Sequence, residues 1–589
     1  MKNILITGVS MVALAIAAPT FAQNISDIDQ TGNGNGATVT QNGSGNESDV
    51  DQDGDSNIVT IGQDGTDGTA GVLQTGNSNT TTIDQTSIEG LIDVVQNGDD
   101  NIANVTQNDA SDRDTLQPLD ADPEARINQQ GNGNDSSISQ TNVVGSFNLV
   151  ANNNQNGDDN ISSITQEANG PGFTGTLRAF VNQSNGADSL VTQIANNRAQ
   201  AFRAEVTQDD STSSVIQTGN ASTVPNNPSL RAVVNQAGGS GSNVNQTVNG
   251  AGGGDLFASV LQRNGATSTV NQTANGAASV TQDAIVDQDG DNTSTINQTF
   301  ELANSNTFLT TVTQRGDGNT SNVSQSDFGG VNAFADEGLT ATVNQTGDNN
   351  TSDLTQLNKY ATATITQSGN GNASEATQNG SNNLLINVLQ TGDDNASTIG
   401  QTGLTNSADV FQEGNDTTSE ITQSGRSNSA FIDQLTGSDG SSSVVTQTGG
   451  LAHQFNIANV TQSGADNESE VTQSGFAGLA NVNQSGPNNG STIEQIGSIA
   501  GATNTATVNQ SGADNGSEVF QDGSLNTALL TQSGNDNTSD VSQTGNGNTS
   551  DILQSGSLNT ASVTQTSDNN MSTINQLGTG GSVTVTQGF

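Results

Sequence analysis

The chain has 589 residues, and 60 Asp and Glu against 11 Lys and Arg give it a net charge of −49. Such an acidic chain is repelled by a phosphate backbone, which speaks against nucleic acid as a partner. Hydrophobic residues make up 29% and aromatic residues 3%, too little for an ordinary globular core of this size. The chain has no Cys and therefore no disulfides, so cysteine content neither indicates nor excludes an oxidising compartment.

Residues 1–22 have the pattern of a secretory signal peptide. Lys2 supplies the positive charge, an apolar segment follows it, and small residues precede a cleavage position after Ala22. The apolar segment is too short for a membrane anchor, and no second candidate follows it. We therefore expect a secreted protein whose mature chain begins with a strand at residues 24–30.

A repeat of 11 residues organises the remainder of the chain. Gln recurs at this spacing from the start: Gln30, Gln41, Gln52, Gln63, Gln74, Gln85, Gln96 and Gln107. A fixed short period indicates a repeat architecture rather than the disorder that the composition alone suggests. We expect regular repeats at 23–140, repeats with loop insertions at 141–345, and regular repeats at 346–589. In the middle region the gaps between Gln residues rise to between 15 and 20, which fits insertions at turns.

The last repeats, at residues 532–587, indicate how one unit folds. Asn537 and Val541 lie an even number of residues from Gln543, so all three point to the same side of a strand. Asp540 points to the other side. The first side holds the aliphatic residue, and the second is polar or acidic. We therefore expect the first side to face the core.

A tight turn separates successive strands. Residues 544–547 (Thr-Gly-Asn-Gly) supply the Gly and Asn that accept positive φ at little cost. Glu470 and Glu518 occupy an outward position at which the units that follow them have Asn481 and Leu529, and this alternation suggests two strands per coil. The sequence predicts an all-β, amyloid-like β-solenoid of strand-turn-strand coils with about 22 residues per coil.

Residues able to carry catalysis or bind a metal are scarce. His453 is the only His, and we expect it in a surface loop without a fixed carboxylate partner. The turns at 98–101 and 392–395, both Gly-Asp-Asp-Asn, offer oxygen ligands for calcium. The motif of calcium-binding solenoids is not repeated here, however, and Asn and Asp favour such turns for backbone reasons. We predict no enzyme, no catalytic residue, no cofactor and no specific metal site.

The inward Gln and Asn residues are the strongest functional signal. Stacked coils place each such amide above another at about 4.8 Å, so that hydrogen bonds can run along the axis. These ladders either hold a monomeric rod together or continue between molecules and form a fibre. We favour the fibre, and we predict that its ladder includes these residues of the last repeats: Gln532, Asn537, Val541, Gln543, Asn548, Ile552, Gln554, Asn559, Val563, Gln565, Gln576 and Gln587.

These units resemble curlin repeats, the building blocks of curli, the amyloid fibres of bacterial surfaces. The family pattern is S-x-x-x-x-x-Q-x-G-x-x-N-x-A-x-x-x-Q. Its second part is matched in full by Gln554, Gly556, Asn559, Ala561 and Gln565. The resemblance implies a β-solenoid with two strands per coil, export through an outer-membrane channel, and assembly into adhesive fibres of the biofilm matrix. It also implies other copies of the chain and a nucleator subunit as partners.

Three features depart from the family pattern. Asn537 and Asn548 stand where the pattern opens with Ser. The chain is several-fold longer than a typical curlin. A Gly-rich export segment before the first repeat is missing if cleavage follows Ala22. The export route, and the choice between a major subunit and a nucleator, therefore stay open.

The leading hypothesis is a secreted structural subunit that self-assembles into curli-like amyloid fibres for cell adhesion and biofilm, located on the cell surface as a fimbrium. The alternative is a monomeric surface adhesin or binding rod that contacts its ligand through the loops of residues 141–345. Eight of the nine Arg fall between Arg113 and Arg315, so the surface around these loops carries most of the positive charge.

Overall fold

The computed structural model describes most of the chain, and its regular structure is β-strand. No helix occurs among the described residues, and hence none that is long and apolar enough to cross a membrane. The described residues are 23–109, 123–143, 149–169, 176–196, 201–220, 229–249, 254–275, 280–301, 306–327, 338–449, 455–499 and 502–588. The expected signal peptide and His453 lie outside these ranges.

The chain divides into two compact units, which are described separately. Unit 1 comprises Met1–Gly290, Thr295–Thr307 and Gly330–Asp336. Unit 2 comprises Asp291–Ser294, Phe308–Gly329 and Glu337–Phe589.

The strands that lie wholly or mainly in unit 1 are β1 (Ile25–Thr31), β2 (Gly36–Ser44), β3 (Glu47–Asp53), β4 (Ile58–Thr66), β5 (Thr69–Thr75), β6 (Thr80–Gln85), β7 (Leu91–Asn97), β8 (Ile102–Asp109), β9 (Glu124–Gln130), β10 (Asp135–Asn142), β11 (Leu149–Asn156), β12 (Ile161–Ala168), β13 (Leu177–Ser184), β14 (Asp188–Ala195), β15 (Phe202–Asp209), β16 (Thr212–Gly219), β17 (Ser229–Ala237), β18 (Gly241–Val248), β19 (Gly254–Arg263), β20 (Thr267–Ala274), β21 (Val280–Asp289) and β22 (Thr293–Phe300).

The strands that lie wholly or mainly in unit 2 are β23 (Asn306–Arg315), β24 (Thr320–Asp327), β25 (Leu339–Thr346), β26 (Thr351–Ser368), β27 (Ala373–Gln390), β28 (Ala396–Gly403), β29 (Ser407–Gln412), β30 (Thr418–Ser424), β31 (Asn428–Gln434), β32 (Ser442–Gly449), β33 (Asn456–Gln462), β34 (Glu468–Gly475), β35 (Gly478–Gln484), β36 (Gly490–Gly497), β37 (Asn504–Gln510), β38 (Gly516–Ser524), β39 (Thr527–Gln532), β40 (Thr538–Asn546), β41 (Thr549–Gln554), β42 (Thr560–Gln565), β43 (Met571–Gln576) and β44 (Ser582–Gln587).

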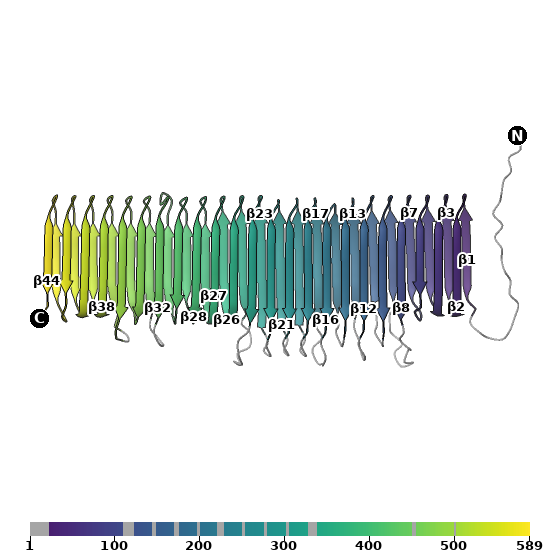
Figure 1. The fold of residues 1–589 in the computed structure, drawn as a ribbon, viewed down its shortest axis with the longest axis horizontal. Coiled ribbons are helices and arrows are strands. Elements are labelled where there is room, and N and C mark those ends of the chain that lie inside the picture. The colour runs from purple at the N-terminus through teal and green to yellow at the C-terminus, as the bar shows by residue number, and fades with distance from the viewer. Residues whose placement is uncertain are drawn as a thin grey trace, which may run out of the picture. The chain divides into compact units, whose positions relative to one another are not determined.

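Within each unit, a strand pairs in parallel with the strand two positions away in the chain, as β1 does with β3 and β2 with β4. Successive strands therefore alternate between two stacks, which we call the odd stack and the even stack after the strand numbers. The long strands β26 and β27 belong to both: residues 351–357 and 373–379 pair in the even stack, and residues 361–367 and 384–390 in the odd stack. The fold is the predicted β-solenoid with two strands per coil (Figure 1).

The coil repeat is 22 residues wherever the turns are short. Gln52, for example, hydrogen-bonds to Gln74, 22 residues further on. Where residues are inserted, the coil lengthens but the register is kept, because Gln96 remains the partner of Gln129, 33 residues on. Each connection with four or more extra residues runs from the even stack to the odd stack. The insertions therefore occur at one kind of connection and leave the register of the paired strands unchanged.

The two sides of each strand differ as the sequence predicts. In β40, Val541 and Gln543 are fully buried, whereas Thr538 and Asp540 are exposed. The interior of a coil is thin, and each strand contributes one or two buried aliphatic residues beside its buried amides and hydroxyls, as Leu530 of β39 and Val541 of β40 do. Such an interior needs few hydrophobic residues per coil, because the stacked polar side chains pair with one another.

The turn predicted at 544–547 is partly wrong, because β40 continues to Asn546. Gly545 and Gly547 do have positive φ, of 112° and 71°. Gly545 nevertheless stays paired with Gly523 of β38, since parallel coils in the same register can continue their pairing into the bend. Stacking of the turns themselves therefore extends the strand beyond the point at which the sequence suggests that it ends.

The middle coils of unit 1 contain a larger apolar core that sequence reasoning missed. Its buried members are Leu149, Ala168, Leu177, Ala195, Phe202, Leu230, Val248, Leu256 and Ala274. The Leu and Phe residues stand six places before a ladder Gln, the place that Asn537 occupies in a regular repeat. Asn at this place bonds to a tight turn. Because the insertions replace that turn, an apolar side chain fills the position instead.

Candidate functional site: the side-chain ladders

Two rows of Gln side chains run through each unit, one in each stack. In most coils the side-chain nitrogen of the Gln donates to the side-chain oxygen of the Gln in the next coil, although no such bond joins Gln183 to Gln208. In unit 2 the rows run from Gln314 to Gln576 and from Gln325 to Gln587. The even stack of unit 1 has an unbroken row, with N–O distances of 2.7 to 3.1 Å, through Gln41, Gln63, Gln85, Gln107, Gln140, Gln166, Gln193, Gln217, Gln246, Gln272 and Gln298.

Most ladder Gln residues also join the two stacks, and Gln543 is an example. The side-chain nitrogen of Gln543 donates to Gln565 at 2.9 Å and to the backbone carbonyl oxygen of Thr527, in the odd stack, at 3.0 Å. Its side-chain oxygen accepts a hydrogen bond from Gln521 at 2.9 Å. Both ends of the buried amide are thus satisfied, which removes the free-energy cost of burying it.

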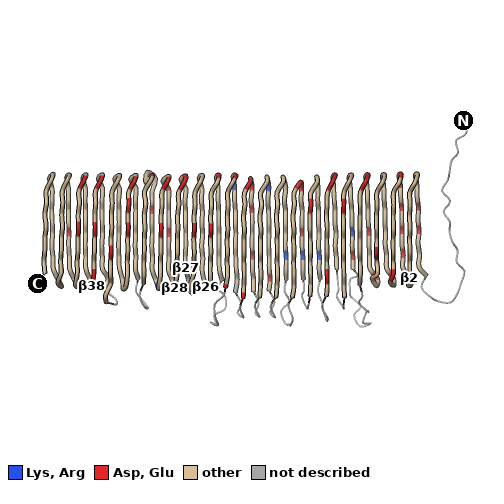
Figure 2. Tube along the Cα trace, in the orientation of Figure 1, with Lys and Arg blue, Asp and Glu red and all other residues tan. Residues whose placement is uncertain are grey.

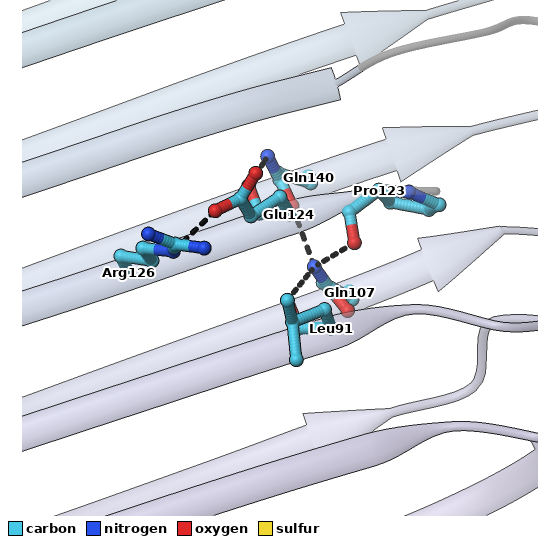
Figure 3. A network of polar contacts seen from close by, with 6 residues as sticks. All are labelled: Leu91, Gln107, Pro123, Glu124, Arg126 and Gln140. Carbon is cyan, nitrogen blue, oxygen red and sulfur yellow. Dashed lines mark hydrogen bonds and ion pairs between the residues drawn. The ribbon is translucent and has the colours of Figure 1, made fainter. Parts of the chain in front are cut away.

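Figure 3 shows the same arrangement next to an inserted segment. Gln107 donates to the carbonyl oxygens of Leu91 and Pro123, at 3.3 and 3.2 Å, and to Gln140 at 2.9 Å. Gln140 in turn donates to the carbonyl oxygen of Glu124 at 2.9 Å. Because 33 residues separate Gln107 from Gln140, the ladder contact does not depend on the length of the connection between coils.

Asn residues at the turns form a second type of ladder, which runs in the opposite direction. Asn537 donates from its backbone N–H and from its side chain to the side-chain oxygen of Asn515 in the preceding coil, at 3.1 and 3.0 Å. Its side chain also donates to the carbonyl oxygen of Gly556 at 2.9 Å. Gln ladders therefore donate toward later coils, and Asn ladders toward earlier ones.

Glycines at the turns approach one another too closely for a side chain to fit. A Cβ added to Gly534 would lie 1.6 Å from the carbonyl oxygen of Gly556 in the next coil, and one added to Gly512 would lie 1.8 Å from that of Gly534. By contrast, a Cβ added to Gly516, at the start of β38, would have no atom within 4 Å. The turn glycines are therefore required by the spacing between coils.

The structure places the predicted ladder residues inside these rows. The Gln members lie in the two Gln rows of unit 2, the Asn members in the Asn ladders, and the aliphatic members among the buried residues between them: Gln532, Asn537, Val541, Gln543, Asn548, Ile552, Gln554, Asn559, Val563, Gln565, Gln576 and Gln587. These contacts lie within one molecule, so the role of the same residues in a fibre stays a prediction.

The acidic turns hold other turns in place. Among the described residues, no group of three or more His, Cys, Asp or Glu is arranged to bind a metal ion. In the turn at 98–101, a carboxylate oxygen of Asp99 accepts hydrogen bonds from the backbone and side-chain N–H groups of Asn77, at 2.7 and 3.0 Å. Asp393 accepts in the same way from the backbone N–H of Asn370 at 2.7 Å. These carboxylates link successive turns.

A half-buried carboxyl on the outer surface of unit 2 makes stability depend on pH. Burial raises the pKa of Asp409 above the ordinary value of 3.8, while hydrogen bonds from Asn387 and Ser407 oppose the shift. Because the pKa is higher in the folded chain, the protonated carboxyl favours folding. Its contribution is present below pH 3.8 and is lost as the pH rises through the raised pKa.

We therefore expect Asp409→Asn to melt at a higher temperature than the wild type at neutral pH, and at nearly the same temperature below pH 3.8. Thermal unfolding followed by circular dichroism at both pH values measures the difference. Asp540→Asn, which removes an exposed carboxylate of β40, controls for the change in net charge. Equal melting temperatures of the Asp409→Asn variant and the wild type at neutral pH would contradict the prediction.

Comparison with known proteins identifies the repeat. The family model of the curlin associated repeat matches residues 27–54, 414–449, 512–545, 534–566 and 545–578. These five segments are similar to the curlin associated repeat. No match was found among curated proteins or among solved structures. The first curlin repeat segment lies in unit 1 and the others in unit 2. Both the curlin repeat and the β-solenoid are structural rather than catalytic.

The departure from the curlin pattern at Asn537 has a structural reason. A Ser has one O–H to donate, whereas the amide of Asn537 bonds to both Asn515 and Gly556. Coils outside the matched segments keep the same ladder, since Gln345 donates to Gln367 at 2.8 Å. The Gln positions of the curlin pattern therefore join successive coils outside the matched segments as well.

Sequence reasoning missed one row of side chains on the outer surface. Arg178, Arg203 and Arg231 are register partners on the neighbouring strands β13, β15 and β17. Each stands five residues before a ladder Gln and directly before an Ala. This shared position is the signal that could have revealed the row.

Proposed function

We propose that the protein is a secreted structural subunit that self-assembles end to end into curli-like amyloid fibres for cell adhesion and biofilm. The observation that carries the proposal is the Gln ladder, in which each coil binds the next through contacts that a second copy can repeat. The matches to the curlin associated repeat support it, because curli fibres are built from such repeats. On this proposal, the protein acts outside the cell as part of a fimbrium.

The ladder geometry favours the addition of further coils. Parallel, in-register strands with stacked amide side chains are the arrangement of cross-β fibres. Any coil that lacks a neighbour leaves backbone N–H and C=O groups unpaired, and such an edge is a template for another strand. Binding of a second copy pairs these N–H and C=O groups in hydrogen bonds of the same length as those that join coils within the molecule. Export through an outer-membrane channel and growth from a nucleator subunit complete the proposal.

Purified protein of residues 23–589 provides the test. We expect it to form fibres that diffract at about 4.7 Å along the fibre axis, and we expect preformed fibres to shorten the lag before growth. X-ray fibre diffraction and seeded growth kinetics measure the two effects. Protein that stays monomeric for days at high concentration and does not respond to seeds would overturn the proposal.

A monomeric surface adhesin is the second candidate, and one observation favours it. The connections with four or more extra residues all run from the even stack to the odd stack. Loops that connect the elements of a rigid scaffold often carry its binding residues. The same experiment separates the two functions, because a binding rod stays monomeric.

A further inference from the structure

The outer surface of the odd stack in unit 1 carries a column of arginines. Arg178, Arg203 and Arg231 are exposed and lie on adjacent strands, and Figure 2 shows basic positions gathered on neighbouring strands there. Adjacent strands are about 4.8 Å apart, and like charges directly opposite each other destabilise a sheet. A chain with nine Arg in 589 residues thus places three of them where they repel one another. We call these three residues the arginine column.

Few carboxylates neutralise the arginine column. Arg203 forms an ion pair with Glu205, and a guanidinium nitrogen of Arg231 lies 3.9 Å from the same carboxylate. The next carboxyls along the column are two strands away on either side: Glu124, which forms an ion pair with Arg126, before Arg178, and Asp283 beyond Arg231. Among the described residues, therefore, two of the three arginines share one carboxylate in ion-pair contact, and the column keeps a net positive charge.

Two aromatic rings hold the guanidinium groups in position. Arg203 lies over the ring of Phe180, 5.8 Å from its centroid, and Arg231 lies over Phe257 at 5.3 Å. Such contacts attract the cation and restrict its rotation, so less entropy is lost when a ligand binds. A planar, ordered guanidinium group suits a carboxylate, which it can bind through two parallel hydrogen bonds.

A matching column of carboxylates occurs on the outer surface of the even stack in unit 2. Its members are exposed and stand three residues before a ladder Gln, and register pairing places them in one line along the axis: Asp353, Glu375, Glu420, Glu470, Glu518 and Asp540. We call these six residues the acidic column. Both columns are spaced by the separation of strands, about 4.8 Å or a multiple of it. Uncharged residues separate most of the carboxylates, so that Glu470 and Glu518 are two strands apart. Arg178 and Arg231 are also two strands apart and can therefore each face a carboxylate of such a pair.

We propose that the arginine column of one copy binds the acidic column of a second copy, so that solenoids associate side by side. The net charge of −49 does not prevent this, because charges separated by more than about 8 Å are largely screened at physiological ionic strength. The local charges on the two facing surfaces then determine whether two copies attract each other. This lateral contact uses the outer faces of the sheets, and it goes beyond the end-to-end growth proposed above.

Charge reversal tests the contact. Freshly purified, unassembled protein is examined by sedimentation velocity at an ionic strength of about 0.15 M, where we expect the wild type to form side-by-side pairs that separate when sodium chloride is raised to about 1 M. R178E/R203E/R231E is expected to weaken pairing at least tenfold. The control R126E/R263E/R426E changes the net charge equally at other exposed arginines and is expected to pair like the wild type. Circular dichroism checks that each variant retains its strands.

A second variant makes the result independent of any effect on folding. E470K/E518K/D540K reverses part of the acidic column and is expected not to pair with itself, but to pair with R178E/R203E/R231E. Wild-type protein that stays single, reversed variants that pair like the wild type, or a mixture that does not pair would each overturn the proposal. Association of the wild type only after addition of polygalacturonate would assign the arginine column to an acidic polysaccharide instead. Sedimentation of unassembled protein needs no fibres, so failure of end-to-end growth leaves this test intact.

Discussion

Gly534→Ala is expected to open the stack of coils at its turn and to destabilise the surrounding coils by about 3 kcal/mol or more. The added methyl group would lie 1.6 Å from the carbonyl oxygen of Gly556, which also accepts a hydrogen bond from Asn537. The next coil must move away, and this movement breaks the Asn ladder at the turn. Hydrogen exchange measured by mass spectrometry should show lost protection in β38 to β42, because solenoids lose stability locally.

Gly516→Ala is the matched control for this change. Its Cβ meets no atom within 4 Å, and Gly516 is not among the glycines with positive φ. We expect unchanged protection or a slight gain, because Ala restricts the unfolded chain more than Gly does. Equal exchange in the two variants would show that the approach between turn glycines is not required for stacking.

The second large effect is expected from Gln543→Leu. Leu has a similar size but cannot replace the bonds from Gln521, to Gln565 and to the carbonyl oxygen of Thr527. Gln521 keeps its bond to the carbonyl oxygen of Thr505, so two acceptors lose a donor, and at about 1 to 3 kcal/mol each the loss is about 2 to 6 kcal/mol. Urea unfolding of the purified protein, with exchange in β38 and β42 as the local measure, reports this loss.

Thr538→Val is the control for Gln543→Leu. Thr538 lies on the exposed side of β40 and takes part in the Gln ladder only through its backbone oxygen, to which Gln554 donates. Val keeps the β-branched shape, so we expect a change of less than about 0.5 kcal/mol. If Gln543→Leu proves equally mild, the ladder amides contribute little beyond filling space.

Much of the fold follows from two periods in the sequence. The 11-residue spacing of Gln predicts the strands, and the even spacing of Val541 and Gln543 predicts which side is buried. These predictions succeed because each coil repeats the same local rules. The cross-stack bond from Gln543 to Thr527 was not predicted, since it depends on how closely the two stacks face each other.

The arginine column shows why the rest could not be predicted in this way. Arg178 and Arg203 are 25 residues apart, and Arg203 and Arg231 are 28 apart. Insertions of unequal length hide this alignment from any fixed period, and only the register of the strands brings the three side chains together. The apolar core around Phe202 was missed for a related reason, because it replaces an amide of the regular repeat.

The opposed directions of the Gln and Asn ladders have an electrostatic consequence. A row of amides that all donate the same way adds up its dipoles, as the peptide groups of a helix do. Here Gln543 points its N–H toward the later coil, whereas Asn537 points its N–H toward the earlier one. The dipoles of the Gln row and the Asn row therefore point in opposite directions and partly cancel in every regular coil. A solenoid built in this way gains little net dipole from its side chains as coils are added. A growing side-chain dipole therefore does not limit its length.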